Sequence, residues 1–193
     1  MFEKIIEFET ALARFTGAPR AVMTDCCTHA IELCMRYDRV EFCAFTPFTY
    51  LSIPMLMHKL GIQYSYNQEQ WTGEYRFRKT RIWDSARRLE SNMYRTGQIQ
   101  CVSFGYDKPL PIGRGGAILL DDETAYQALL AMRYDGRDLS VSPWIAQQTF
   151  RVGYHYRPTI EEAERGLQLL SQYQSQPPRE VVYPDCRQIS IVS

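Results

Sequence analysis

Five side chains that can do chemistry stand at or just after the ends of short apolar runs. They supply two hydroxyls, an aromatic ring, a carboxylate and an amine: Thr28, Ser103, Tyr50, Asp84 and Lys108. Short apolar runs bounded by turn residues are typical of buried strands. Ligands of an open α/β sheet bind beyond the carboxyl ends of its strands. We therefore expect these five groups to converge on one edge of a sheet.

This set of groups suits a flat, phosphorylated, aromatic cofactor. Thr28 and Ser103, with the start of a helix, would hold a phosphate, and Tyr50 would cover the face of a ring. Asp84 would pair with a protonated ring nitrogen, and Lys108 would form an imine. These are the requirements of pyridoxal phosphate. Taken singly, each residue has a commoner structural explanation, so the prediction depends on the ordered combination.

The elements that must position these residues alternate along the chain. Helical patterns are expected at 2–15, 28–36, 51–60, 123–133 and 159–173, and strands at 21–24, 42–45, 62–66, 81–84, 98–104 and 117–120. Asp122 is placed to cap the fourth helix, and Thr159 begins a capping box for the fifth. Segment 67–80 is interpreted as a linker or hairpin, and 138–157 shows no clear period. This alternation predicts a three-layer α/β protein with a mostly parallel sheet and flanking helices.

Composition limits the function classes. The chain has 193 residues, 45% of them hydrophobic, with 22 basic and 22 acidic residues. A formal charge of +0 argues against a general nucleic-acid binder, and the basic run at 76–81 is better explained as a solvated strand face. No apolar run approaches the roughly 20 residues of a membrane span. We expect small-molecule partners, with neither nucleic acid nor membrane among them.

The six cysteines show no C-x-x-C pairing, so we expect no metal site. Cys34, Cys43 and Cys101 lie among apolar residues and are interpreted as small core hydrophobes. Unpaired thiols in a chain with a sizeable core favour a reducing, cytoplasmic setting.

Five segments carry recognisable motifs in a consistent order. They are FEKIIEFETALARFTGAPRAVMTDCCTHAIELCMR at 2–36, TPFTY at 46–50, WDSARRL at 83–89, CVSFGYDKPLPIGRGGAILLDD at 101–122 and VGYHYRPTIEEAERGLQLL at 152–170. Together they resemble the DegT/StrS family of pyridoxal-phosphate-dependent sugar aminotransferases. The spacing from serine to lysine, followed by Gly-Gly, is the most specific part of the resemblance.

The resemblance implies the fold of the large domain of a fold-type I pyridoxal-phosphate transferase. It implies that Lys108 is the catalytic Schiff-base lysine and proton shuttle, and that Asp84 holds the pyridinium proton. It also implies that Tyr50 stacks on the ring while Thr28 and Ser103 bind the phosphate.

Three further cofactor-binding positions follow from the resemblance, each with an altered residue. Cys27 replaces the glycine of the family's Ser-Gly-Thr phosphate turn, and Arg87 replaces a glutamine or histidine near the ring hydroxyl. His155 replaces an asparagine that reaches the phosphate of the partner subunit in the family's dimer. The resemblance therefore implies a homodimer with a shared site.

The length bears on domain organisation. We expect one compact cofactor-binding domain over 1–175 and a C-terminal tail over 176–193, with the family's small C-terminal domain largely missing. The predicted function is transfer of an amino group from an amino acid such as glutamate to a keto-sugar, which is nucleotide-linked in the family. The alternative is a catalytically impaired, truncated relative that acts as a cofactor-binding or structural dimer subunit. A cysteine-nucleophile enzyme using Cys27 and a histidine has no supporting spacing and ranks lower.

Overall fold

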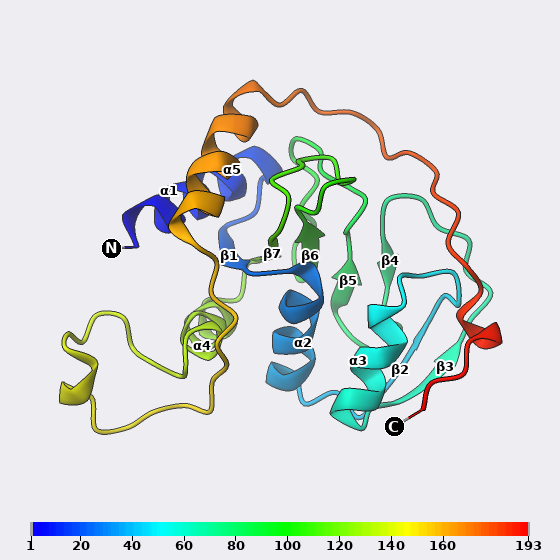
Figure 1. The fold of residues 1–193 in the computed structure, drawn as a ribbon, viewed down its shortest axis with the longest axis horizontal. Coiled ribbons are helices and arrows are strands. Elements are labelled where there is room, and N and C mark those ends of the chain that lie inside the picture. The colour runs from blue at the N-terminus through cyan, green and yellow to red at the C-terminus, as the bar shows by residue number, and fades with distance from the viewer. Residues whose placement is uncertain (1, 193) are drawn as a thin grey trace.

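The computed structural model describes residues 2–192 as helices and strands that alternate along most of the chain (Figure 1). The elements, in chain order, are α1 (Glu3–Thr16), β1 (Arg20–Thr24), α2 (Cys27–Tyr37), β2 (Phe42–Phe45), α3 (Ser52–Leu60), β3 (Gln63–Tyr66), β4 (Tyr75–Arg76), β5 (Ile82–Asp84), β6 (Ile99–Ser103), β7 (Gly116–Leu120), α4 (Glu123–Arg133), η1 (Trp144–Ala146), α5 (Ile160–Gln172) and η2 (Cys186–Gln188). All five predicted helices and all six predicted strands are present. The two-residue strand β4 was not predicted as a strand, although it lies in the segment interpreted as a linker or hairpin.

The main sheet has the strand order β1-β7-β6-β5-β4, and β2 pairs with β3 beside it. Strands β1, β5 and β6 share one direction. An antiparallel bridge joins Ala44 of β2 to Arg78, which follows β4. Because β4 is itself antiparallel to β5, β2 and its parallel neighbour β3 run in the direction of β5. The pairing differs from the mostly parallel sheet that we predicted, because β7 and β4 run the other way and their ladders are antiparallel. Each joins its neighbour through a loop rather than a crossover helix, so it must return antiparallel.

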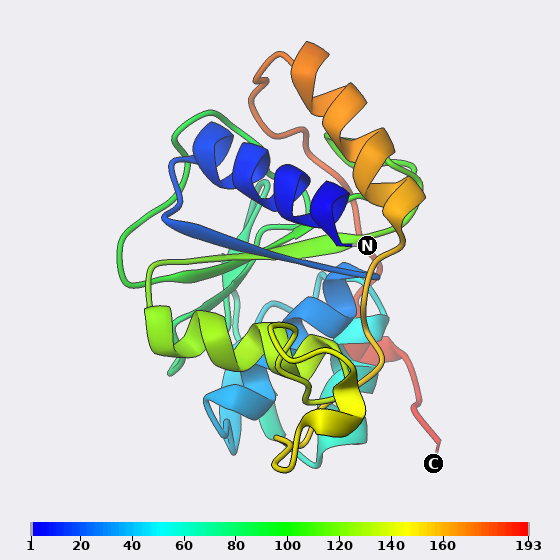
Figure 2. The same cartoon turned by 90° about the vertical axis from the view of Figure 1, so that its left-hand side faces the viewer.

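Two apolar clusters on opposite faces of the sheet make the three layers (Figure 2). Successive strand residues point to opposite faces. Accordingly, Val22 packs with α2 and α4, whereas Met23 packs with α1 and α5. In β6, Cys101 and Val102 divide in the same way. The predicted α/β class with flanking helices is therefore confirmed.

Local signals explain where the helices begin and end. Helix α1 ends at Gly17, whose φ of 75° is a left-handed conformation that suits glycine. Asp122 caps α4 by accepting a hydrogen bond from the Ala125 amide, and Thr159 with Glu162 forms a capping box at α5. Both caps agree with the prediction.

After α5 the chain runs extended along the outside of the molecule to η2, shown in red in Figure 1. The Cys186 amide donates to the Pro47 carbonyl at 3.0 Å, and Tyr183 stacks on Trp71 with ring centroids 5.7 Å apart. The segment from 176 onward is thus held against the loops that follow β2 and β3. The division into a domain over 1–175 and a tail stays a prediction.

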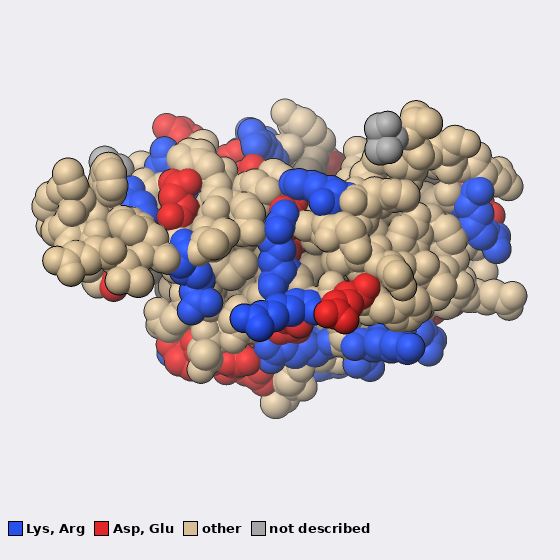
Figure 3. Space-filling model, turned by 90° about the horizontal axis from the view of Figure 1, so that it is seen from below, with Lys and Arg blue, Asp and Glu red and all other residues tan. Residues whose placement is uncertain are grey.

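The surface mixes both signs of charge. Figure 3 shows Lys and Arg side chains lying beside Asp and Glu side chains on one face. Lys4 with Glu7, and Arg20 with Glu123, are exposed ion pairs of this kind. Within residues 2–192 no helix combines the length and apolar character that a membrane crossing requires.

Candidate active site

A cavity of about 560 Å³ opens beyond the carboxyl ends of β1, β5 and β6. This volume lies within the range of small-molecule sites. We call it the Lys108 cavity. Seven of the eight predicted site residues line it: Cys27, Thr28, Tyr50, Asp84, Arg87, Ser103 and Lys108. They come from separate parts of the chain and meet here because these strands share one direction.

Asp84 is a buried carboxylate at the end of β5. Its Oδ2 accepts a hydrogen bond from the Tyr75 hydroxyl at 2.9 Å, and its Oδ1 accepts one from the Ala86 amide at 3.0 Å. Thr49 bonds the same Tyr75 hydroxyl at 2.7 Å. Burial raises the pKa of Asp84, while the two hydrogen bonds and the charges of Lys108 and Arg87 oppose that rise. The two hydrogen bonds therefore fix the orientation of the Asp84 carboxylate. A positively charged group beside it would stabilise its ionised form.

Lys108 lies on the loop between β6 and β7. A backbone hydrogen bond of 3.1 Å from its amide to the Gly105 carbonyl closes a turn at this point. Its side chain is 14% exposed, with Nζ 3.7 Å from Asp107 Oδ1. The largely buried side chain of Lys108 thus lines the same cavity as Asp84.

The first turn of α2 forms another wall. The first N–H groups of a helix have no partner within it, which makes this end suitable for a phosphate. Thr28 and Ser103 offer hydroxyls here, and Thr28 Oγ1 lies 2.8 Å from Ser52 Oγ. A Cβ on Gly116 would lie 2.4 Å from the Cys27 nitrogen, so the glycine allows α2 to start directly against β7.

Cys27 lies at the position for which the sequence resemblance predicts a glycine. Its thiol is buried and donates to the Cys101 carbonyl at 3.6 Å, so the sulfur is engaged with β6. Burial raises the pKa of Cys27 well above its usual value, with a further contribution from Asp84. This disfavours the thiolate that a cysteine nucleophile requires.

The mouth of the cavity is aromatic and includes residues that the sequence did not single out. Tyr50 is 64% exposed there, whereas Trp71 and Tyr183 stack on each other. Arg87 spans the mouth, donating to the Tyr183 hydroxyl at 2.9 Å and to the Asp107 carbonyl at 2.7 Å. Together with Thr49 and Tyr75, these contacts join residues remote from one another in the chain, and no sequence pattern pairs them.

His155 is the one predicted site residue that the fold does not bring to this cavity. Its side chain is 66% exposed, and its Nδ1 lies 3.1 Å from Asp135 Oδ2. It belongs to the segment before α5, which lies apart from the Lys108 cavity. Its implied role toward a partner subunit stays a prediction.

The residues present fit pyridoxal phosphate. A helix start with two hydroxyls can bind the phosphate, and a buried carboxylate can accept a hydrogen bond from a ring N–H. The amine of Lys108, on the loop between β6 and β7, lines the same cavity. The observation that carries this fit is that Asp84, although buried, accepts hydrogen bonds at both oxygens, and that Lys108 and Arg87 are near enough to oppose the rise that burial causes in its pKa.

Comparisons with known proteins agree with the resemblance. Residues 89–177 match the model of the DegT/DnrJ/EryC1/StrS aminotransferase family. Among curated proteins, no relative matches the chain.

Solved structures match more of the chain. Sugar aminotransferase CalS13 from Micromonospora echinospora aligns with a TM-score of 0.73 at 17% identity, covering 89% of this chain and 61% of that one. PseC from Helicobacter pylori, an aminotransferase of pseudoaminic acid biosynthesis, aligns with 0.70 at 14% identity over 89% and 61%. GDP-4-keto-6-deoxymannose-3-dehydratase with a trapped PLP-glutamate geminal diamine aligns with 0.69 at 14% identity over 89% and 61%. These likenesses show the fold, and the chain spans about 61% of the length of such structures.

Proposed function

We propose that this chain is a pyridoxal-phosphate-dependent protein of the sugar-aminotransferase type. It moves an amino group from an amino acid such as glutamate to a keto-sugar, with a nucleotide-linked sugar as the favoured substrate. The observation that carries the proposal is that Lys108, Asp84 and the start of α2 line one cavity. The family match over 89–177 and the sugar aminotransferases among the similar structures support it.

The residues divide the work by position. Pyridoxal phosphate, when bound, supplies an electron sink for the substrate carbon. Thr28, Ser103 and the first amides of α2 bind its phosphate. Asp84 accepts a hydrogen bond from the ring N–H and stabilises its positive charge. Lys108 lines the cavity and would hold and release a proton at Nζ.

Three further residues complete the site. Tyr50 would cover the ring face and Arg87 would contact the ring hydroxyl, since both line the cavity. Cys27 contributes its backbone amide, because its thiol is engaged with Cys101.

We further propose a homodimer in which His155 serves the site of the partner subunit. His155 is exposed at the end of the 138–157 segment, which projects from the rest of the chain (Figure 1). Large apolar side chains of the same segment are exposed as well: Trp144, Ile145, Phe150 and Val152. Exposed apolar groups gathered on one segment are typical of an interface. The six free cysteines support the cytoplasmic setting that we propose.

The decisive test is attachment of the cofactor to one lysine. Purified protein is mixed with pyridoxal phosphate, reduced with borohydride and analysed by peptide mass spectrometry. We expect a covalent adduct on the peptide that contains Lys108, and its loss in Lys108→Ala. The control Lys4→Ala changes a lysine that pairs with Glu7 on the surface of α1, away from the cavity. Wild-type protein without an adduct at Lys108 would overturn the proposal.

A second candidate is a cofactor-binding subunit without turnover. It is favoured by Val181, Val182 and Tyr183, which line the cavity where a substrate would enter. Addition of glutamate to the cofactor-loaded protein separates the two functions. The aminotransferase converts the cofactor to its amine form, detected by chromatography, whereas the binding subunit leaves it unchanged.

A further inference from the structure

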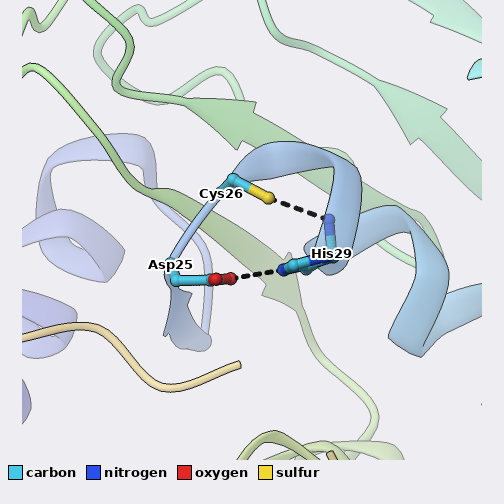
Figure 4. Close-up of side chains that lie close together, drawn as sticks. All are labelled: Asp25, Cys26 and His29. Carbon is cyan, nitrogen blue, oxygen red and sulfur yellow. Dashed lines mark hydrogen bonds and ion pairs between the residues drawn. The ribbon is translucent and has the colours of Figure 1, made fainter. Parts of the chain in front are cut away.

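Three side chains just after β1 lie close together beside the Lys108 cavity. They are Asp25, Cys26 and His29, which we call the Asp25 cluster. One carboxylate oxygen, the thiol sulfur and one imidazole nitrogen all lie within 4.8 Å of one another. Figure 4 shows the Asp25 carboxylate and the His29 ring pointing toward each other, with the Cys26 sulfur above them. The mechanism proposed above assigns no role to any of the three.

The local backbone builds the cluster. Cys26 is the N-cap of α2, and its sulfur accepts a hydrogen bond from the His29 amide at 3.4 Å. This places residues 26 and 29 on the same side of the first turn. Residue 25 precedes the cap, and its Oδ1 lies 2.7 Å from His29 Nδ1. The three donors therefore come from five consecutive residues and need no long-range contact to meet.

Outer contacts fix the orientation of two of the donors. Tyr156 stacks on the His29 ring with centroids 3.7 Å apart and planes 8° from parallel. Arg114 donates to Asp25 Oδ2 at 3.0 Å and to the Asp25 carbonyl at 3.2 Å. Oδ1 is left to face His29. Such outer partners are what orients the ligands of a metal in proteins.

We propose that Asp25, Cys26 and His29 bind a divalent transition-metal ion of the zinc class. Sulfur, imidazole nitrogen and carboxylate oxygen are the donors that zinc takes in proteins, and three protein ligands leave the fourth position open. The ion replaces the proton shared by Nδ1 and Oδ1, and the cysteine loses its own proton on binding. Thiolate and carboxylate then balance the two charges of the ion.

This site differs from the zinc pattern sought in the sequence. A zinc site with paired C-x-x-C spacing has no counterpart in this sequence, whereas residues 25–29 read Asp-Cys-x-x-His. The spacing places cysteine and histidine on one side of a helical turn, and the preceding aspartate completes the set.

Cobalt(II) is the probe, because a cobalt–thiolate bond gives a charge-transfer absorption in the near ultraviolet. Protein treated with a chelator and free of added cofactor is titrated with Co²⁺. We expect this absorption to saturate at one ion per chain, and Zn²⁺ to displace the cobalt. Because no cofactor is present, the result is independent of the function proposed above.

Variants locate the ion. Cys26→Ser keeps an N-cap oxygen for α2, so the fold is retained, as circular dichroism would confirm. It is expected to abolish the charge-transfer absorption and to weaken Co²⁺ binding by at least about tenfold. His29→Gln is expected to weaken binding to a similar degree.

Matched controls distinguish the cluster from the other sulfur and imidazole groups. Cys34 and Cys101 form another close thiol pair, with sulfurs 3.9 Å apart, and His58 lies on α3. Cys34→Ala and His58→Gln should leave Co²⁺ binding unchanged. The proposal is overturned if the wild type shows no thiolate absorption, if the absorption survives in Cys26→Ser, or if it is lost in Cys34→Ala.

Discussion

Asp84 and Asp25 are two carboxylates near the start of α2 whose pKa values are shifted in opposite directions. Asp84 is buried among neutral donors, the Tyr75 hydroxyl and the Ala86 amide, and burial raises its pKa. Asp25 is also partly buried, which would raise its pKa. Its hydrogen bonds and ion pairs with His29 and Arg114 prevail and lower it instead.

The difference teaches that partners, more than burial, decide what each carboxylate can do. In the metal-free protein, Asp25 is paired with His29 and Arg114 of the same chain and stabilises the folded state through them. Asp84 has only neutral hydrogen-bond donors, with Lys108 and Arg87 acting at longer range. It is therefore suited to a cation that arrives with a ligand. The following predictions separate these two roles.

Replacing each aspartate with asparagine should have the largest effects. Asp84→Asn removes the charge that stabilises a protonated ring, so conversion of the bound cofactor by glutamate should slow by about 10²–10³-fold. Asp25→Asn should leave that rate nearly unchanged but lose charge-assisted hydrogen bonds, lowering the free energy of unfolding by about 1.5–3 kcal/mol. Stopped-flow spectroscopy and urea denaturation measure the two effects. Equal effects of both variants on both readouts would contradict the distinction.

The His29–Asp25 pair should give metal-free protein a pH-dependent stability. Burial lowers the pKa of His29, but the hydrogen bond to Asp25 and the adjacent Cys26 outweigh it and raise the pKa from 6.5 to about 9. A pKa raised by folding stabilises the protein fully below the unfolded value and loses that contribution as the pH rises through the folded value. Urea denaturation between pH 6.5 and 9 should therefore show falling stability.

The groups that face His29 are Asp25 and Cys26, with Arg114 behind the carboxylate and Tyr156 against the ring. In His29→Gln the slope of stability against pH over this window should flatten. An unchanged slope in that variant would assign the effect to other groups.

Tyr75→Phe tests whether Asp84 depends on its neutral donor. Loss of the hydroxyl leaves Asp84 Oδ2 with one donor fewer in a buried site, at a cost of about 1–3 kcal/mol in the free energy of unfolding at neutral pH. The pKa of Asp84 should rise further, so the cost should shrink as the pH falls. Tyr64→Phe, which removes a hydroxyl near the exposed His58 ring, is the control and should change stability little. A Tyr75→Phe penalty independent of pH would rule out this coupling.

The sequence located much of the Lys108 cavity because its residues stand at strand ends. Once strands alternate with helices, the carboxyl ends of β1, β5 and β6 must share an edge, and Asp84, Ser103 and Lys108 follow from that rule. The pairing of β7 and β4 could not be obtained in this way, since it depends on how the loops return. The contact between Tyr75 and Asp84 depends on the antiparallel register of β4 with β5, where these two residues are directly paired.

The Asp25 cluster shows that residues close together in the sequence can form a site that the sequence alone does not predict. Its residues lie within one stretch of five positions and are visible in the sequence, yet only the N-cap geometry of Cys26 shows that their donors meet. Tyr183 is harder still, because its position depends on a long extended segment that packs against Trp71, more than a hundred residues earlier in the chain. A packing interaction of this kind leaves no local periodicity to detect.

Tyr183→Ala should have the smallest effect. It tests whether the segment at the mouth of the Lys108 cavity restricts entry of the cofactor without affecting the Asp25 cluster. The change removes the stacking on Trp71 and the hydrogen bond from Arg87, worth about 0.5–1.5 kcal/mol for an aromatic pair. Because these contacts hold the segment over the cavity, pyridoxal phosphate should associate faster, while Co²⁺ binding at the Asp25 cluster stays the same. Val192→Ala is the control, since Val192 is 93% exposed and does not line the cavity. If Tyr183→Ala and Val192→Ala give the same association rate, the contacts of Tyr183 do not restrict entry of the cofactor.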